Sequence, residues 1–243
     1  MSSSEKGIMR RALAIIPARG GSKRIPRKNT RPFVGQPIIR YSIDAALGAG
    51  CFEEVMVSTD DQEIAAVAMA YGAKIPFLRS AERSNDYATT VDVIEEVLEC
   101  YSRMENRFEY LCCIYPTAPF VTSEKIATCM RMLVEQDVDA VLPVVRFSYP
   151  IQRSLKIDGD GFVRMVWPEN YNMRSQDMNP TYHDSGQFYC MRTAALLAQK
   201  RLFAERTLPF ELSELEVQDL DNEEDWRLAE VKCRVMKERR REG

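Results

Sequence analysis

Short apolar runs alternate with segments of helical periodicity up to Val145, and this alternation limits the possible folds more than any other feature. Buried strands are predicted by the apolar runs at residues 12–17, 54–58, 74–78, 110–114 and 140–145. Helices are predicted between them at residues 37–47, 60–71, 90–103 and 123–136, the second opened by a Thr59-x-x-Gln62 capping box. Strands that alternate with helices of about three turns indicate right-handed crossovers and a mainly parallel sheet covered on both faces. The predicted fold class is therefore α/β.

The alternation ends after Val145. A hairpin is predicted from residues 154–157 and 162–167, which flank a turn of alternating Asp and Gly. A polar segment without periodicity continues to Asp184, and such stretches in compact domains are usually functional or packed against a partner. The remaining predictions are strands at 187–191 and 214–219 and helices at 194–200 and 222–240. A chain of 243 residues is expected to form one domain with an extension.

Positive charge is concentrated near the N-terminus although the chain is acidic overall. Ten Lys and Arg residues and no Asp or Glu lie between Lys6 and Ile43, whereas the whole chain has a formal net charge of −3, so the rest carries −13. A basic block inside an acidic protein indicates a local anion site. It argues against a nucleic-acid partner, for which the positive charge would extend over a whole face.

The cysteines and the apolar segments bear on where the protein resides. The seven cysteines include no C-x-x-C pair and lie mostly within apolar runs, so they are expected to be reduced and buried. No segment approaches the ~20 consecutive apolar residues of a membrane span, and the N-terminal MSSSEKGIMRR lacks the apolar core of a signal peptide. We therefore expect a cytoplasmic protein without a membrane partner.

The loop after the first predicted strand combines glycines with cations in the sequence AIIPARGGSKRIPRKN, residues 14–29. Ligands of parallel sheets bind at the carboxyl ends of strands, where this loop would lie. Gly20 and Gly21 would let backbone N–H groups approach an anion, and Ser22 would add a donor. The cations expected to supply charge are Arg19, Lys23 and Lys28. The loop matches neither G-x-x-x-x-G-K-[ST] nor G-x-G-x-x-G, but its chemistry predicts a phosphate site; the alternative is a flexible loop with hydrated charges.

Two carboxylates before the last predicted helix form a second candidate site. Asp219 and Asp221 lie two residues apart at the end of the predicted strand, in the sequence ELEVQDLD, so their side chains would point the same way and could share Mg²⁺. The alternative is that Asp221 caps the following helix. A structural role is predicted for His183, the only histidine, because no arrangement of Ser or Cys indicates a catalytic triad. A cationic loop, a carboxylate pair and an α/β sheet together indicate phosphoryl or nucleotidyl transfer.

The sequence AIIPARGGSKRIPRKN resembles the N-terminal signature of the cytidylyltransferases that activate eight- and nine-carbon 2-keto sugar acids, the CMP-sialic acid and CMP-Kdo synthetase family. Further segments resemble this family in the expected order: VSTDDQEIAAVAMAYGA, FLRSAERSNDYATTVDVI, CCIYPTAPF and VQDLDNEEDW. Within it, IYPTAPF and RSQDMNPTYHDSGQFY resemble the pseudaminic acid enzymes. Tyr115 stands where sialic acid enzymes tend to have glutamine, and Ser185-Gly186 where they have Asn-Gly. The chain departs from the pseudaminic acid enzymes at Ser185, usually Ala, and at Cys190, commonly Trp.

The resemblance implies a Rossmann-like three-layer nucleotidyltransferase fold with particular residues in particular roles. Those expected to bind CTP are Arg19, Gly20, Gly21, Ser22, Lys23, Lys28, Asn29, Arg79, Ala88 and Thr90, with Arg19 and Lys28 as catalytic cations. Those expected to bind the sugar are Tyr115, Arg174, Gln187, Phe188 and Tyr189. At least one of Phe188 and Tyr189 would instead be core if it faces away from the site. Mg²⁺ would be held by Asp219 and Asp221, whereas Arg24 and Arg27 would only raise the local potential.

The resemblance also implies an assembly and a reaction. A single domain, residues 1–243, would form a homodimer through an extension at 147–182, and Arg174 would reach the carboxylate of the sugar acid in its own subunit or across the dimer interface. The C2 hydroxyl of a nine-carbon ulosonic acid, expected to be pseudaminic acid, would attack the α-phosphorus of CTP and release pyrophosphate. No side chain is identified as a general base. Such an enzyme would serve surface glycan biosynthesis, flagellin glycosylation included. The alternatives are sialic or legionaminic acid as acceptor, another phosphate-loop NTPase or kinase, and a nucleic-acid binder.

Overall fold

A seven-stranded mixed sheet forms the centre of the protein. The structure is a computed structural model that describes residues 11–242, so the N-terminal sequence, for which no signal peptide is predicted, lies outside the described residues. The strands are β1 (Ala12–Pro17), β4 (Glu54–Ser58), β5 (Tyr110–Ile114), β6 (Ala140–Arg146), β9 (Tyr182–Asp184), β10 (Phe188–Arg192) and β11 (Thr207–Leu212). Their order is β11-β6-β10-β5-β1-β4, and β9 also pairs with β6. Only β9 and β10 run opposite to the other strands of this sheet, which confirms the predicted mainly parallel arrangement.

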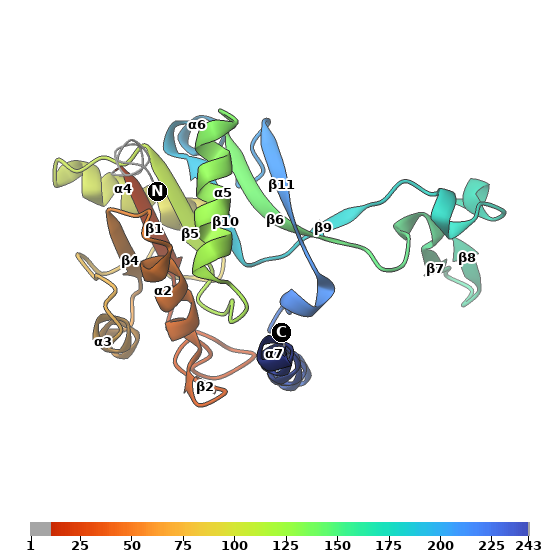
Figure 1. Cartoon of the computed structure of the whole chain (residues 1–243), viewed down its shortest axis with the longest axis horizontal. Coiled ribbons are helices and arrows are strands. Elements are labelled where there is room, and N and C mark those ends of the chain that lie inside the picture. The colour runs from red at the N-terminus through yellow and green to blue at the C-terminus, as the bar shows by residue number, and fades with distance from the viewer. Residues whose placement is uncertain (1–10, 243) are drawn as a thin grey trace.

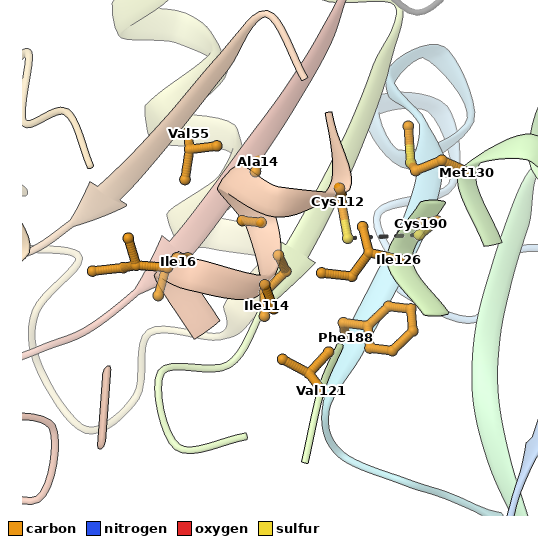
Figure 2. Close-up of a cluster of buried hydrophobic side chains, with 14 of the residues drawn as sticks. Ala14, Ile16, Val55, Cys112, Ile114, Val121, Ile126, Met130, Phe188 and Cys190 are labelled. Carbon is orange, nitrogen blue, oxygen red and sulfur yellow. Dashed lines mark hydrogen bonds between the residues drawn. The ribbon is translucent and has the colours of Figure 1, made fainter. Parts of the chain in front are cut away.

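Helices cover both faces of the sheet (Figure 1). They are α2 (Ile38–Ala49), α3 (Gln62–Ala70), α4 (Thr90–Arg103), α5 (Ser123–Glu135), α6 (Thr193–Gln199) and α7 (Glu223–Glu242). Side chains of β1 alternate between two core clusters: Ile16 packs in one with Ile126 of α5, and Ile15 packs in the other with Ile94 of α4. Figure 2 shows the first cluster, which also contains Phe188 of β10. The predicted three-layer α/β fold is confirmed.

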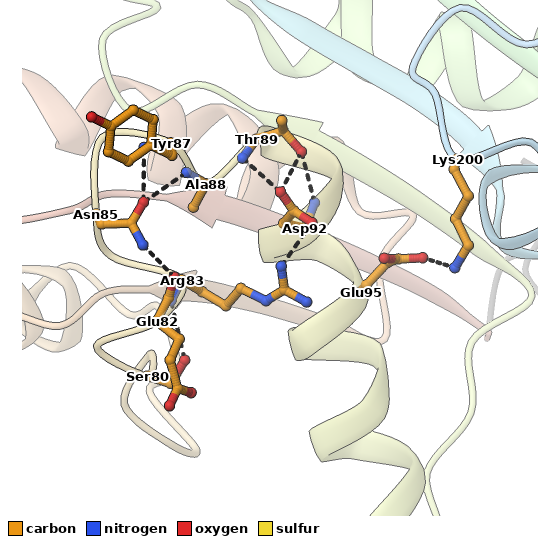
Figure 3. A network of polar contacts seen from close by, with 10 residues as sticks. All are labelled: Ser80, Glu82, Arg83, Asn85, Tyr87, Ala88, Thr89, Asp92, Glu95 and Lys200. Atoms are coloured by element: carbon orange, nitrogen blue, oxygen red, sulfur yellow. Dashed lines mark hydrogen bonds and ion pairs between the residues drawn. The ribbon is translucent and has the colours of Figure 1, made fainter.

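Side-chain caps fix where two of these helices begin. At α4, Thr89 Oγ1 accepts a hydrogen bond from the Asp92 N–H at 3.2 Å, and the Thr89 N–H donates to Asp92 Oδ2 at 2.8 Å (Figure 3). At α3 the cap is Asp61, whose Oδ1 accepts from two backbone N–H groups of the first turn at 2.8 and 3.0 Å. The predicted capping box from Thr59 to Gln62 is therefore wrong, because a carboxylate two residues later satisfies the free N–H groups.

The edges of the sheet differ from the prediction. Residues 74–78 form no strand and contribute one isolated bridge, between Met56 and Lys74. β11 is a strand that the sequence pattern does not predict, because Pro209 interrupts its apolar run. Proline is tolerated there since β11 lies at the edge of the sheet, where one side of the strand needs no partner.

The segment before α7 is a turn, and the strand predicted at 214–219 is absent from it. Ser213 and Glu216 form a capping box that closes the 3-10 turn η4 (Glu214–Glu216). Asp219 and Asp221 therefore do not share a strand, and the predicted reason for their closeness is wrong. Leu220 between them is buried, and this anchors the segment.

The C-terminal helix α7 packs against the loop that follows β1. Ile25 of this loop shares a buried cluster with Leu220 and Trp226. The guanidinium of Arg31 lies 4.5 Å from the centroid of the Trp226 ring and donates two hydrogen bonds to the Glu223 carboxylate, at 2.6 and 2.9 Å. A short hairpin follows this loop, formed by β2 (Pro32–Phe33) and β3 (Gln36–Pro37). This packing brings the segment from Asp219 to Asp221, which is distant in sequence, beside the loop that follows β1.

An extension projects from the body of the protein between β6 and β9 (Figure 1). It contains the predicted hairpin, formed by β7 (Leu155–Ile157) and β8 (Val163–Met165). Three 3-10 turns complete it: η1 (Ile151–Arg153), η2 (Pro168–Asn170) and η3 (Ser175–Asp177). Large apolar side chains exposed on the extension include Tyr149, Leu155, Ile157, Phe162, Val163 and Tyr171.

All seven cysteines are free thiols, and all but the half-buried Cys100 are buried. Burial raises the pKa of Cys51 and of Cys113 to about 12, so both stay protonated at neutral pH. The prediction of reduced cysteines in the core is confirmed for these buried thiols. Within residues 11–242, no helix combines the length and the apolar character needed to cross a membrane.

Candidate active site

Contacts along its length hold the loop after β1 in place. The Gly20 N–H donates to Asp60 Oδ1 at 2.9 Å, and Asn29 Nδ2 donates to the carbonyl of Arg19 at 2.9 Å. Ile25, in the middle of the loop, is fully buried. These contacts argue against a flexible loop, because they fix its backbone while leaving several of its cations exposed.

Beside this loop lies a cavity of about 430 Å³, which we call the basic pocket. It is lined by Pro17, Arg19, Ser22, Lys23, Arg24, Lys28, Asn29, Asp86, Tyr115, Pro116 and Thr117. The pocket lies at the carboxyl ends of β1 and β5, where ligands of parallel sheets bind. Its lining contains four cations and one carboxylate, a composition suited to a polyanion.

Asp86 is this carboxylate, and two of the cations are bonded to it. Arg19 Nη1 lies 2.8 Å from Asp86 Oδ1, and Lys23 Nζ lies 2.5 Å from Asp86 Oδ2. Hydrogen bonds from Lys23 and then Arg19 lower the pKa of the Asp86 carboxyl. Asp86 therefore satisfies the cations in the way that an anionic ligand group would.

Lys28 differs from the other cations of the loop in its surroundings. Burial lowers the pKa of its ammonium group, while the carboxylates of Asp219 and Asp221 act in the opposite direction. Asp221 is ion-paired with Arg24 at 2.5 Å. The Asp219 side chain is exposed, and no hydrogen bond or ion pair from the described residues reaches its carboxylate. The fold thus places both candidate metal ligands beside the loop after β1.

A second cavity, of about 510 Å³, adjoins the first, and we call it the polar pocket. It is lined by Tyr115, Thr117, Val145, His183, Asp184, Ser185, Gly186, Gln187, Glu214, Val217, Gln218, Asp219 and Lys232. Tyr115 and Thr117 line both pockets, so ligands bound in the two would be neighbours.

Two buried polar atoms of residues lining the polar pocket have no hydrogen-bond partner among the described residues: Ser185 Oγ and Gln187 Oε1. Gln187 Nε2 donates to the carbonyl of Glu216 at 2.6 Å, which fixes the orientation of its amide. Buried polar groups are nearly always bonded to something, so these two atoms indicate a ligand or water that completes them.

Hydroxyl groups form hydrogen bonds around Tyr115, which lines both pockets. Thr90 Oγ1 and the Tyr115 hydroxyl oxygen lie 3.0 Å apart, and the Tyr189 hydroxyl is bonded to the carboxylate of Asp184. The rings of Tyr115 and Tyr189 meet edge to face, with centroids 5.7 Å apart. Burial raises the pKa of both phenols, so both remain protonated donors at neutral pH.

A comparison with protein families decides the class to which this site belongs. The family model described as Cytidylyltransferase matches residues 13–233 of the chain. The protein belongs to the cytidylyltransferase family. It is therefore a nucleotidyltransferase, a conclusion that favours the predicted reaction class over a kinase, another NTPase or a nucleic-acid binder.

Individual relatives of this cytidylyltransferase match nearly its whole length. A pseudaminic acid cytidylyltransferase of Campylobacter jejuni is 38% identical, over 92% of this chain and 96% of the relative. A CMP-N,N'-diacetyllegionaminic acid synthase of Legionella pneumophila is 35% identical, over 90% of this chain and 95% of the relative. A solved structure of a CMP:2-keto-3-deoxy-manno-octonic acid synthetase complexed with CTP is 18% identical, with a TM-score of 0.67 over 94% of this chain and 99% of the other. This last likeness supports the fold.

The structure brings most of the predicted phosphate-binding residues of the cytidylyltransferase together. Those that line the basic pocket are Arg19, Ser22, Lys23, Lys28 and Asn29. Gly20 and Gly21 lie in the same loop, between Arg19 and Ser22. Arg24, expected only to raise the local potential, also lines the pocket and pairs with Asp221. Arg27 is ion-paired with Glu63 instead.

Three other predicted nucleotide-binding residues do not belong to the lining of either pocket. Arg79 is buried, and its Nε donates to Ser58 Oγ at 3.0 Å. Ala88 lies in the turn before α4, where its N–H donates to Asn85 Oδ1 at 3.0 Å (Figure 3). Thr90 is the first residue of α4. Nucleotide binding by these residues stays a prediction.

Of the predicted sugar-binding residues, Tyr115 and Gln187 line the polar pocket. Phe188 does not, because its side chain is fully buried in the core cluster of Figure 2, which is the core position expected for one of Phe188 and Tyr189. Side chains alternate along β10, so the neighbouring Tyr189 takes the opposite face, toward Tyr115. Arg174 is exposed on the extension and lines neither pocket, and its action from another subunit stays a prediction.

Several residues of the two pockets are not predicted by the sequence. Asp86 comes from the turn before α4, Asp184 from β9 and Lys232 from α7. Asp184 lies within the segment YHDSGQFY, which offers a signal, whereas nothing distinguishes Lys232 from the other cations of its helix. His183, predicted to be structural, lines the polar pocket, and its Nδ1 lies 2.9 Å from the carbonyl of Asp184.

Proposed function

We propose that this cytidylyltransferase transfers CMP from CTP to the C2 hydroxyl of a nine-carbon ulosonic acid, pseudaminic acid, and releases pyrophosphate. The observation that carries the proposal is the pair of adjoining pockets, one cationic and one polar, that share Tyr115 and Thr117. The Campylobacter jejuni relative, named for pseudaminic acid, supports that acid as the acceptor. Legionaminic acid, in the name of the Legionella pneumophila relative, and sialic acid are the alternative acceptors.

The basic pocket would bind the triphosphate of CTP. Arg19 and Lys23 would exchange the Asp86 carboxylate for phosphate oxygens, which offer the same charge-assisted hydrogen bonds. Lys28 would lie next to the α-phosphate. Because Lys28 is more buried than the exposed Lys23, its charge is less screened by water and would stabilise the charge that develops in the transition state more strongly.

The polar pocket would hold the acid with its C2 hydroxyl toward the α-phosphorus. The bond formed joins the C2 oxygen to the α-phosphorus, and the bond broken joins the α-phosphorus to the oxygen that leads to the β-phosphorus. The proton of the C2 hydroxyl passes to water, and pyrophosphate leaves with the bridging oxygen. Ser185 Oγ and Gln187 Oε1 would complete their hydrogen bonds with the hydroxyl and amide groups of the sugar. Holding both reactants in adjacent pockets is itself a large part of the rate enhancement for such a transfer.

The carboxylates of Asp219 and Asp221 fit a magnesium ion. Both act on the ammonium of Lys28, and the Asp219 carboxylate has no partner among the described residues. Magnesium is usually held by one or two carboxylates together with substrate phosphates and water. Within residues 11–242, no group of three or more His, Cys, Asp or Glu is placed so that it could hold a metal ion, and substrate phosphates would have to supply further ligands. When bound, Mg²⁺ would neutralise charge on the phosphates.

The metal proposal makes a direct prediction for Asp219→Asn. This variant should lose about 100-fold or more of its activity at limiting Mg²⁺, because one of the two protein ligands becomes neutral. Its melting temperature should stay near that of the wild type, since the carboxylate has no protein partner to lose. The control is Glu224→Gln, an exposed change in the first turn of α7. Equal Mg²⁺ titrations of activity for Asp219→Asn and the control would contradict the assignment.

We further propose that the enzyme is a homodimer that forms through the extension. The exposed apolar side chains of the extension support this, because contiguous apolar patches on soluble proteins mark interaction surfaces. Arg174 would then reach the acid bound by the other subunit. The free thiols agree with a cytoplasmic enzyme, whose product would serve surface glycan biosynthesis such as flagellin glycosylation.

The acceptor is tested by measuring kcat/KM for pseudaminic, legionaminic and sialic acids side by side with saturating CTP and Mg²⁺. We expect pseudaminic acid to have the highest value. A higher value for either other acid would overturn the choice of acceptor but leave the reaction in place.

A further inference from the structure

Lys232 of α7 occupies an unusual position for a helix lysine. Its side chain lines the polar pocket, and Nζ donates to the carbonyls of Glu214 at 3.0 Å and of Val217 at 2.7 Å. An ammonium group has three N–H donors, so two are used by the turn before α7 and one is left for a ligand. Burial lowers the pKa of Lys232, while Glu214 acts to raise it.

The rest of the polar pocket is unfavourable for an acid. Asp184, Glu214 and Asp219 contribute three carboxylates to its lining, and of the described residues that line it only Lys232 is a Lys or Arg. A sugar acid entering this pocket would meet like charges, which cost free energy when they lie close together at low dielectric. A substrate with a carboxylate therefore needs a cation here, and the lining offers Lys232.

The chemistry of an ulosonic acid places its carboxylate close to the reacting atoms. The carboxylate carbon is bonded to C2, whose hydroxyl attacks the α-phosphorus, so the cation that binds it must lie near Lys28 and Asp219. Lys232 meets this requirement, because its Nζ is bonded to Val217, only two residues before Asp219. Two residues of extended chain span at most about 7 Å.

We propose that Lys232 binds the carboxylate of the acid acceptor from within the same subunit. This assignment rests on the proposed function, and it adds to the predicted sugar-binding residues a cation from α7. It also orients the acceptor, because a carboxylate fixed on one side of C2 turns the neighbouring hydroxyl toward the basic pocket.

A purely structural role for Lys232 makes a different prediction. Lys125 provides the comparison, because it holds the same turn from another side: its Nζ lies 2.8 Å from Glu216 Oε1 and donates to the carbonyl of Phe120 at 3.2 Å. Lys125 does not line the polar pocket. If holding this turn were the only task of Lys232, removal of either lysine should have the same consequences.

The test compares Lys232→Gln with Lys125→Gln and Lys232→Arg. Glutamine keeps N–H donors for the two carbonyls but removes the charge. We expect Lys232→Gln to raise KM for the acid by about 10- to 100-fold with KM for CTP unchanged, the usual effect of losing one hydrogen bond to a charged group. Lys232→Arg should recover part of this loss, and Lys125→Gln should lower the melting temperature without changing KM for the acid. Should Lys232→Gln not fold, Lys232→Arg takes its place, and its KM for the acid and its preference for the acid over the carboxamide described below are compared with those of the wild type.

A second readout uses the C1 carboxamide of the acceptor, which has no charge at this position. The wild type should prefer the acid to its carboxamide, and Lys232→Gln should lose most of this preference. An unchanged KM for the acid, or an unchanged preference in a folded variant, overturns the assignment of Lys232 alone. Absence of turnover of any ulosonic acid by the wild type would overturn the proposed function and this assignment together.

Discussion

The cations of the loop after β1 are not equivalent. Arg19 and Lys23 are bonded to Asp86, Arg24 is bonded to Asp221, and Lys28 is partly buried near the carboxylates before α7. Each ion pair lies partly in water, which screens it and leaves it weak. The basic pocket is therefore closed by weak contacts that a triphosphate can replace.

Asp86 would compete with the phosphates of CTP for Arg19 and Lys23. Asp86→Asn should therefore bind CTP more tightly than the wild type, by up to about fivefold, because a neutral amide competes less. Isothermal titration of CTP measures the effect. Asp44→Asn is the matched control, since Asp44 pairs with Arg40 on the surface of α2. Weaker binding of CTP by Asp86→Asn would show that Asp86 belongs to the nucleotide site and does not compete with the ligand.

At the residue scale, the sequence predicts the part of the site that is local along the chain. Arg19, Ser22 and Lys28 belong to the loop that directly follows a buried strand, so their position at the carboxyl end of the sheet can be inferred from the sequence. Asp86 and Lys232 reach the pockets only through tertiary packing, which leaves no local pattern. The sequence leaves open which of Phe188 and Tyr189 faces the site, because the alternation along a strand does not state which parity does so.

At the scale of elements, the loop after β1 and the start of α3 are packed too closely for a side chain at Gly20. A Cβ added there would lie 2.7 Å from Oδ2 and 3.0 Å from Cβ of Asp61, the residue that caps α3. A Cβ added at Gly21 meets nothing within 4 Å. The loop and the helix therefore depend on one another through this contact.

Gly20→Ala should lower the free energy of unfolding by about 1–3 kcal/mol, because either the loop or the Asp61 cap must shift. Gly21→Ala is the matched control and should change the free energy of unfolding by no more than about 0.5 kcal/mol. Urea denaturation of both variants measures these values. Equal stabilities for the two variants would contradict the close packing.

Helices and strands differ in how well the sequence predicts them. The strands β1, β4, β5 and β6 and the helices α4 and α5 are predicted well, because apolar runs and capping residues mark them. The edge strand β11 is not predicted, because it contains Pro209. Residues 214–219 resemble a strand in composition, but they close into a turn around Ser213. Edge strands are set by pairing with a neighbour, and the neighbour β6 is distant in sequence.

At the scale of the whole molecule, the extension is the feature that the body of the protein does not explain. The extension projects away from the sheet (Figure 1). It carries exposed apolar side chains, among them Ile157, which is 74% exposed. Exposed apolar area of this kind is stabilised when a second copy covers it.

The wild type should therefore sediment as a dimer, and Ile157→Asp should shift it toward the monomer, because the interface would bury an unpaired charge. Leu197→Asp on α6, also an exposed aliphatic position, is the control and should leave the dimer intact. A wild type that stays monomeric at micromolar concentrations, or an Ile157→Asp variant as dimeric as the wild type, would contradict this interface.

The central claim is that the two pockets bring CTP and a nine-carbon acid together for transfer of CMP. Phosphorus NMR of a reaction that contains the enzyme, CTP, Mg²⁺ and pseudaminic acid tests it most directly. We predict that the CTP signals are replaced by those of one phosphodiester and one pyrophosphate per CTP consumed, and only when all components are present. Release of inorganic phosphate, or no consumption of CTP with pseudaminic, legionaminic or sialic acid, would contradict the claim.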